Sequence, residues 1–330
     1  MKLICNAIFI FSYFLWRSTL ALSHPKEDLV ISVGDSITAG FLANTSATSG
    51  TELDQDEDRI QEYEISALGT GNTSMHIIPP ELWFAQLFNH KDSYSWASGK
   101  KIRSQFVRLA EFFHVTSPEI LLEAKNVALS GAKTDDLTRQ ANEIVSLWKA
   151  GRVQNIRYLT FLIGANDICL NPKKGTVTDE EFKEHFRDFF ARLAQIHQSE
   201  ALRIIISSLP KIPDLGQPEI GNHVRPSGTT CAHQQLVVDH SCNRLIKWDT
   251  SEEYEQNVAI VEHTNEMIHA LSLEIAENYP QFEIKYSDRL YHEKIQIGHL
   301  AEDCFHPNRF GQELISRLIW QDQPWWPADR

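Results

Sequence analysis

The sequence predicts an α/β fold in which a parallel β-sheet is covered on both faces by helices. Short apolar runs rich in β-branched residues alternate with stretches of helical periodicity, and each run is nearly continuous. Parallel strands that are buried on both faces have this pattern. The predicted strands are Leu29–Val33, Lys125–Leu129, Tyr158–Ile163, Arg203–Ser207 and Phe282–Tyr286. No internal repeat is present, so we expect one α/β domain over residues 24–330.

Three amphipathic stretches are the clearest predicted helices. They cover Glu180–His197, Tyr254–Tyr279 and a last helix that begins near Pro307, because proline suits a first helical turn. The apolar positions of the last helix fall on one face, and they are Phe310, Leu314, Ile315, Leu318 and Ile319. Asn44–Pro80 and Pro210–Asp249 have the composition of loops.

Composition and charge exclude several classes of protein. Apolar residues make up 42% of the 330 residues and charged residues 23%, which excludes a disordered, collagen-like or coiled-coil chain. The formal net charge is −13, and it becomes −15 once residues 1–23 are removed. A chain this acidic lacks the basic surface that nucleic acid requires, and it does not favour electrostatic docking on anionic membranes.

The first 23 residues are typical of a secretory signal peptide. A single Lys2 precedes the apolar run Leu3–Trp16, and small residues follow. A membrane anchor is the weaker interpretation, because Arg17 ends the run below about 18 residues. We expect no transmembrane anchor in the mature chain. Secretion also suits the glycosylation sequons at Asn44 and Asn72.

The cysteine count points to disulfide bonds. Of the five cysteines, Cys5 leaves with the signal peptide, and four remain in a chain expected to be extracellular. Four cysteines allow three pairings. We expect Cys231–Cys242, because these residues are near neighbours in the sequence, and Cys169–Cys304. A structural zinc site at Cys231, His233, His240 and Cys242 is the weaker alternative, because their spacing matches no familiar zinc motif.

Two polar motifs directly follow predicted strands and suit acyl chemistry. Gly34-Asp35-Ser36 places a hydroxyl at the start of a helix, where free N–H groups favour negative charge. Gly164-Ala165-Asn166-Asp167 supplies a neutral amide donor, which can stabilise an oxyanion without changing protonation. Each motif alone also fits an ordinary helix cap or turn.

Two further motifs complete the pattern. Gly131, in the strand end VALSGA, can bring a bare backbone N–H close to a ligand. Asp303 precedes His306 by three residues, so its carboxylate can accept the Nδ1–H and leave Nε2 free as a base. Taken together, the four motifs supply a nucleophile, oxyanion donors and an acid–base pair at the carboxyl edge of a parallel sheet.

These four motifs, in this order and spacing, resemble the conserved blocks of the GDSL, or SGNH, hydrolases. The resemblance implies a three-layer α/β/α sandwich with a flavodoxin-like parallel sheet. It implies Ser36 as the nucleophile, His306 as the base and Asp303 as the residue that orients it. The oxyanion hole would comprise the backbone N–H groups of Ser36 and Gly131 and the amide of Asn166. Asp167 is a rival for the acidic role or a support for its turn.

The strings NVALSGAKTDDL, LIGANDIC and EDCFHPN further resemble the animal phospholipase B branch of that family. This resemblance implies a secreted phospholipase, lysophospholipase or lipase that forms an acyl-enzyme and needs no cofactor or metal. A carbohydrate O-acetylesterase or short-chain carboxylesterase uses the same groups and is the alternative. A non-catalytic secreted binding protein is less favoured, because every member of the triad is present. Trp325 and Trp326 are candidates for transient contact with a lipid interface.

Overall fold

The structure is a computed structural model, and it describes residues 27–48, 93–151, 153–169, 177–238 and 242–327. Five parallel strands form one sheet in the order β2-β1-β3-β4-β5. Their bounds are β1 (Glu27–Gly34), β2 (Leu122–Asn126), β3 (Val153–Leu162), β4 (Leu202–Ser207) and β5 (Phe282–Ser287). This order is that of flavodoxin-like sheets, so the predicted fold class is confirmed.

All five predicted strands are present, but β2 begins and ends three residues earlier than expected. The apolar residues after Asn126 follow the edge of β1 without regular pairing: the N–H of Val127 donates to the carbonyl of Ser32, and that of Leu129 donates to Gly34. The apolar run 125–129 therefore predicts where this segment lies beside β1, but the regular pairing of β2 with β1 covers residues 122–126.

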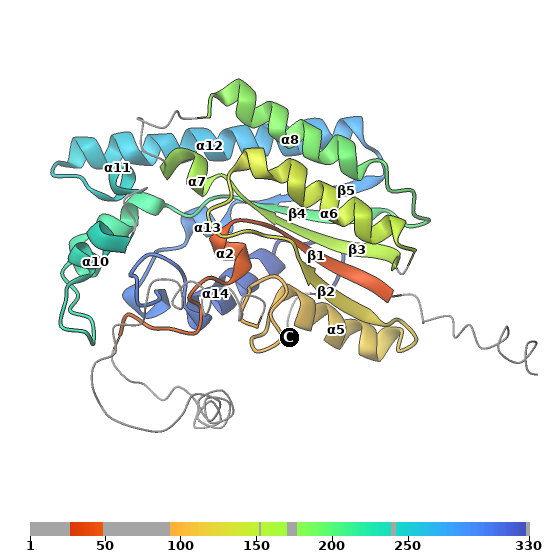
Figure 1. Ribbon diagram of the computed structural model, residues 1–330, viewed down its shortest axis with the longest axis horizontal. Helices are drawn as coiled ribbons and strands as arrows, with labels where there is room; N and C mark the ends of the chain where they lie inside the picture. The colour runs from red at the N-terminus through yellow and green to blue at the C-terminus, as the bar shows by residue number, and fades with distance from the viewer. Residues whose placement is uncertain (1–26, 49–92, 152, 170–176, 239–241, 328–330) are drawn as a thin grey trace, which may run out of the picture.

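Helices cover both faces of the sheet and form a three-layer sandwich (Figure 1). One layer contains α6 (Leu137–Lys149), α8 (Asp179–Leu193) and α12 (Ser251–Asn278), and the other contains α5 (Gln105–Thr116) and α14 (Arg309–Trp320). The shorter helices are α2 (Ser36–Ala39), α7 (Ala165–Cys169), α9 (Pro218–Gly221), α10 (Cys231–Val238), α11 (Asn243–Ile246) and α13 (Arg289–His292), with 3₁₀ turns η1 (Thr134–Asp136), η3 (Ile212–Gly216) and η4 (Ile297–His299).

Local hydrogen bonds determine where the predicted long helices begin and end. A capping box of Thr250 and Glu253 begins α12, and the side chain of Asn308 accepts two backbone N–H groups at the start of α14. Helix α8 stops at Leu193, four residues earlier than predicted, because the chain then turns through backbone bonds back to residues 192 and 193.

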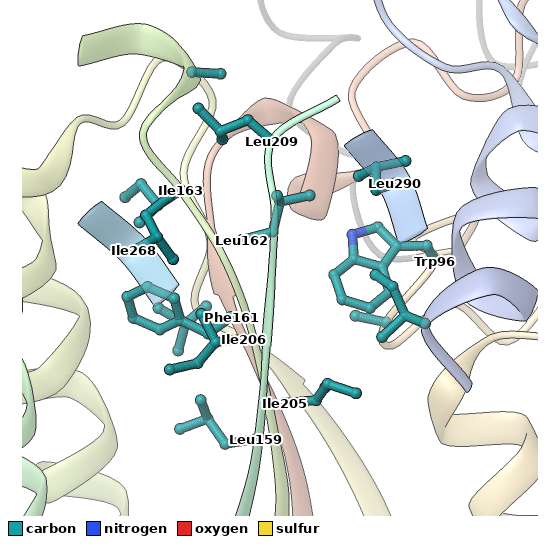
Figure 2. Close-up of a cluster of buried hydrophobic side chains, with 14 of the residues drawn as sticks. Trp96, Leu159, Phe161, Leu162, Ile163, Ile205, Ile206, Leu209, Ile268 and Leu290 are labelled. Carbon is teal, nitrogen blue, oxygen red and sulfur yellow. The ribbon is translucent and has the colours of Figure 1, made fainter. Parts of the chain in front are cut away.

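Side chains of the central strands alternate between the two faces of the sheet (Figure 2). Phe161 and Ile206 point toward the layer of α8 and α12, whereas Leu162 and Ile205 point toward the side of Trp96. Four phenylalanines of α8 at helical spacing form an aromatic cluster, and three of them pack directly on Phe161; the four are Phe182, Phe186, Phe189 and Phe190. This packing fixes the strand that leads into Asn166.

The disulfide pairing differs from the prediction. The bonds are Cys169–Cys242 and Cys231–Cys304, so the expected pairs Cys231–Cys242 and Cys169–Cys304 are wrong. Cys231 is the first residue of α10, and eight helical residues rise about 12 Å, which carries the chain away before Cys242 is reached. Both cysteines of the alternative zinc site are therefore disulfide-bonded, and the described residues contain no group of side chains that could hold a metal ion.

The paired tryptophans near the chain end differ in burial: Trp325 is half-buried with its ring edge-on to Tyr158, whereas Trp326 is buried. Trp326 is 8% exposed and packs against Tyr158 and Trp320, so it is not available to a lipid surface. Of the helices described, none is sufficiently long and apolar to span a bilayer. The predicted signal peptide, Asn72 and His240 lie outside the described residues.

Candidate active site

Ser36 stands at the junction between the first strand and the short helix α2. Asp35 is the N-cap of this helix, and its Oδ1 accepts the N–H of Ile37 at 2.9 Å. Only glycine fits at position 34, because a Cβ there would lie 2.2 Å from the carbonyl oxygen of Leu162 on β3. The side chain of Gln140 on α6 bonds both the N–H and the carbonyl of Gly34, each at 2.9 Å, and so fixes the turn that presents Ser36.

Ser36, His306 and Asp303 form one hydrogen-bonded chain. The Nδ1 of His306 lies 2.5 Å from Oδ2 of Asp303, and its Nε2 lies 2.8 Å from Oγ of Ser36. A carboxylate can only accept, so Nδ1 donates and Nε2 is left to accept the serine proton. The arrangement can therefore turn the Ser36 hydroxyl into a nucleophile.

The loop that carries Asp303 and His306 is held by its own backbone. Oδ1 of Asp303 accepts the N–H groups of Phe305 and His306, each at 3.0 Å, while the N–H of Ala301 donates to the carbonyl of His306. Burial alone would raise the pKa of Asp303, but the charge of His306 and these hydrogen bonds outweigh it and lower that pKa. The carboxylate stays ionised next to the imidazole.

Three N–H groups are the candidate oxyanion donors, and they belong to Ser36, Gly131 and Asn166. The amide of Asn166 donates one hydrogen to the carbonyl of Ala132 at 2.9 Å, which orients the group and leaves its second N–H for a ligand. Gly131 has a φ of +78° and is exposed. Within the described part of the chain, no acceptor takes the N–H of Gly131 or of Ser36. These donors suit an oxyanion hole.

Asp167 takes part in a separate buried network. Its carboxylate accepts the backbone N–H of Thr134 at 3.1 Å and the hydroxyl of Thr134 at 2.7 Å, and that hydroxyl also lies 3.2 Å from Nδ1 of His185. Burial raises the pKa of Asp167 to about 6. The bonds join the turn after Gly131 to the residue beside Asn166, which matches the supporting function considered for this carboxyl.

Asp35 is the other perturbed carboxyl of the site. It is 1% exposed, and its Oδ2 is buried without a hydrogen-bond partner among the described residues. Burial raises the pKa of Asp35 to about 7, although the bond from Ile37 and the charge of His306 oppose the rise. Neither this carboxyl nor the Gln140 clamp was identified in the sequence, where both look like ordinary capping and helix residues.

An apolar cleft begins at Ser36 and Asn166. Its space not filled by protein atoms is about 790 Å³, including the part open to solvent. Aliphatic and aromatic side chains dominate its walls, and they include Ile212 and Leu215 of η3, Leu290 of α13, and Leu314 and Ile315 of α14. The rings of Phe41 and Phe305 pack edge-on against the imidazole of His306, at centroid distances of 4.8 and 5.0 Å.

The fold and the site together define a carboxylic ester hydrolase. The chain belongs to the GDSL-like lipase/acylhydrolase family, because the model of that family matches residues 30–319. This match confirms the family that the four motifs indicated, and it does not distinguish a phospholipase B-like member. Among curated proteins, none matches the sequence.

Several solved structures are similar to this chain. An α/β hydrolase from the metagenome of Lake Arreo, Spain, is 18% identical, with 89% of this chain and 94% of that chain covered and a TM-score of 0.44. A variant of an acetyl xylan esterase from Geobacillus stearothermophilus is 16% identical, with 92% and 97% covered and a TM-score of 0.45. The esterase EstA from Pseudoalteromonas sp. is 10% identical, with 90% and 96% covered and a TM-score of 0.39. The match to the family model, and not the likeness to these structures, shows the family of this chain.

Proposed function

We propose that the protein is a secreted acyl hydrolase of the phospholipase B, lysophospholipase or lipase type. The observation that carries this proposal is the apolar cleft that opens directly at Ser36 and Asn166. The lining of this cleft is mostly apolar, which suits a hydrocarbon chain. An acetyl group needs little apolar lining, whereas apolar side chains from η3, α13 and α14 line this cleft, so the cleft favours a longer acyl chain over the O-acetylesterase alternative.

In the proposed mechanism, Oγ of Ser36 attacks the ester carbonyl while Nε2 of His306 takes its proton. Asp303 stabilises the resulting imidazolium. The N–H groups of Ser36 and Gly131 and the amide of Asn166 hold the tetrahedral oxyanion. His306 then protonates the leaving alcohol. Water, activated by His306, releases the fatty acid and restores the Ser36 hydroxyl.

A chain-length series tests the acyl preference. Purified protein is assayed on p-nitrophenyl esters from acetate to palmitate, and on a phospholipid and a lysophospholipid with mass-spectrometric analysis of the products. We expect kcat/KM to rise with chain length and fatty acid to be released from the lipids. A preference for acetate, with no lipid product, would instead favour the acetylesterase alternative.

A pair of matched variants ties this preference to the cleft. Leu314→Trp places an indole in the cleft wall and should shift selectivity from long-chain esters toward acetate. Leu318→Trp makes the same change one turn later on α14, at a partly buried position that does not line the cleft, and should leave the ratio of long-chain to acetate activity unchanged. Equal ratios in both variants would contradict the assignment of the acyl site.

We also propose that the chain is exported and glycosylated at Asn44. The side chain of Asn44 is exposed, and two disulfides suit an oxidising compartment. Expression of the full chain in secreting eukaryotic cells should give protein in the medium that begins near residue 24. Its mass should fall on enzymatic deglycosylation, and the Asn44→Gln variant should lack the corresponding part of that shift.

A further inference from the structure

Both disulfides join an active-site segment to the region of α10 and α11. Cys169 ends α7, the helix that carries Asn166, and it is bonded to Cys242 just before α11. Cys304 lies between Asp303 and Phe305, and it is bonded to Cys231, the first residue of α10. Figure 1 shows α2, α7, α10 and α11 at the same end of the sheet.

Helix α10 holds Cys304 at two points. Besides the disulfide to Cys231, the carbonyl of Cys304 accepts a hydrogen bond of 2.9 Å from Nε2 of Gln235. Cys231 and Gln235 are four residues apart, so they lie on the same face of the helix. The other amide hydrogen of Gln235 goes to the carbonyl of Leu215 in η3, at 3.1 Å, which anchors the helix beside the acyl cleft.

Cys304 needs such support, because its backbone is in the left-handed region. Its φ is +58°, a conformation that residues other than glycine rarely adopt. Cys231 and Cys304 are 0% exposed and Gln235 is 4% exposed, so the contact is well packed. Cys304 lies within the loop that holds the proposed acid–base pair, in which the carboxylate of Asp303 accepts the N–H groups of Phe305 and His306.

We propose that Cys231 and Gln235 are positioning residues that latch the Asp303–His306 loop in its active geometry. This inference rests on the proposed function, in which His306 activates Ser36. The disulfide and the hydrogen bond fix the backbone of residue 304, and that backbone sets the direction of the Asp303 carboxylate relative to the imidazole. Because hydrogen bonds weaken steeply with misalignment, a released loop has a weaker Asp303–His306 pair and a less basic Nε2.

The test measures the rate at which a fluorophosphonate probe labels Ser36, since this rate reports nucleophile activation without knowledge of the natural substrate. Gln235→Met keeps the size of the side chain but removes both donors. We expect labelling to slow at least tenfold, and the inflection of the labelling rate with pH, which reports the His306 pKa, to move to lower pH. With p-nitrophenyl butyrate as substrate, the loss should appear in kcat with KM nearly unchanged.

Two controls separate positioning from stability. Ile275→Val removes a buried methyl group from α12, away from the loop, and should lower Tm with the labelling rate unchanged. The double variant Cys231→Ala, Cys304→Ala should label slowly. Cys231→Ala with Cys304→Gly should label several-fold faster than that pair, because glycine adopts a positive φ without strain. All rates are measured where circular dichroism shows the variants to be folded.

The outcomes distinguish the two proposals. If Ser36→Ala is labelled as fast as the wild type, the proposed nucleophile is wrong. If Ser36→Ala is not labelled and Gln235→Met is labelled at the wild-type rate with an unchanged pH inflection, the proposed function stands and the latch is refuted. A glycine variant no faster than its alanine counterpart also refutes the latch, because residue 304 would then not need to be held.

Discussion

The role of Asp303 can be tested against that of its rival, Asp167. Asp303→Asn keeps an oxygen for the N–H groups of Phe305 and His306, so the loop should retain its shape. It removes the negative charge that lies 2.5 Å from Nδ1 of His306. The substitution therefore isolates the electrostatic support of the imidazolium from the structure of the loop.

The expected loss follows from that geometry. Unit charges about 4 Å apart interact by about 4 kcal/mol at an effective dielectric constant of about 20. At about 1.4 kcal/mol for each factor of ten in rate, kcat should fall roughly a thousandfold. Asp167→Asn leaves an oxygen to accept from Thr134 and no change at His306, so kcat should fall less than tenfold.

The assay is kcat for a p-nitrophenyl ester at pH 8, where an ordinary histidine is neutral, with Tm measured for each variant. We expect a large loss for Asp303→Asn and a small one for Asp167→Asn. The reverse order, with both variants folded, would assign the acidic role to Asp167 and refute the present interpretation of the triad.

Three further substitutions have defined outcomes. Asn166→Ala removes one oxyanion donor, which typically costs about 3–4 kcal/mol of barrier, so steady-state kinetics should show kcat lower by a hundredfold or more; near-normal turnover would argue against this donor. Asp35→Asn keeps the N-cap but removes a carboxyl whose folded pKa is about 7. Because that pKa is raised, the contribution of Asp35 to stability falls as pH rises from about 4 to 7, by about 4 kcal/mol at about 1.4 kcal/mol per pKa unit. Urea unfolding at pH 4 and pH 8 should show this fall for the wild type relative to the variant. Gly34→Ala would force a Cβ to 2.2 Å from Leu162, so a soluble variant with wild-type Tm would contradict the described packing.

The strands and the geometry of the candidate catalytic motifs could be predicted because their signals are local. A continuous apolar run followed by Gly-Asp-Ser identifies both a buried strand and the turn at its end, and β1 with Ser36 conforms to this. The three-residue spacing of Asp303 and His306 is likewise short enough for one turn, and the structure brings the two side chains into contact.

What the sequence could not supply depends on residues far apart in the chain. Nothing in the sequence near Cys231 indicates that this residue begins helix α10 and is bonded to Cys304 rather than to Cys242. The clamp of Gln140 on Gly34 spans 106 positions and uses a residue type common on helix surfaces. The apolar cleft is lined by residues of η3, α13 and α14, whose apolar residues have the same spacing as those that fill a core.

The order of the bonded cysteines has a consequence for the synthesis of the chain. Along the sequence the first cysteine of the folded part pairs with the third, and the second with the fourth, so the two covalent loops interleave. As the chain leaves the ribosome, Cys169 and Cys231 are available to each other before either final partner has emerged. Any bond between them must later be exchanged, which takes seconds to hours depending on the isomerase present. Recombinant production should therefore benefit from a host that supplies disulfide isomerase, and oxidation without one should trap mispaired, inactive molecules.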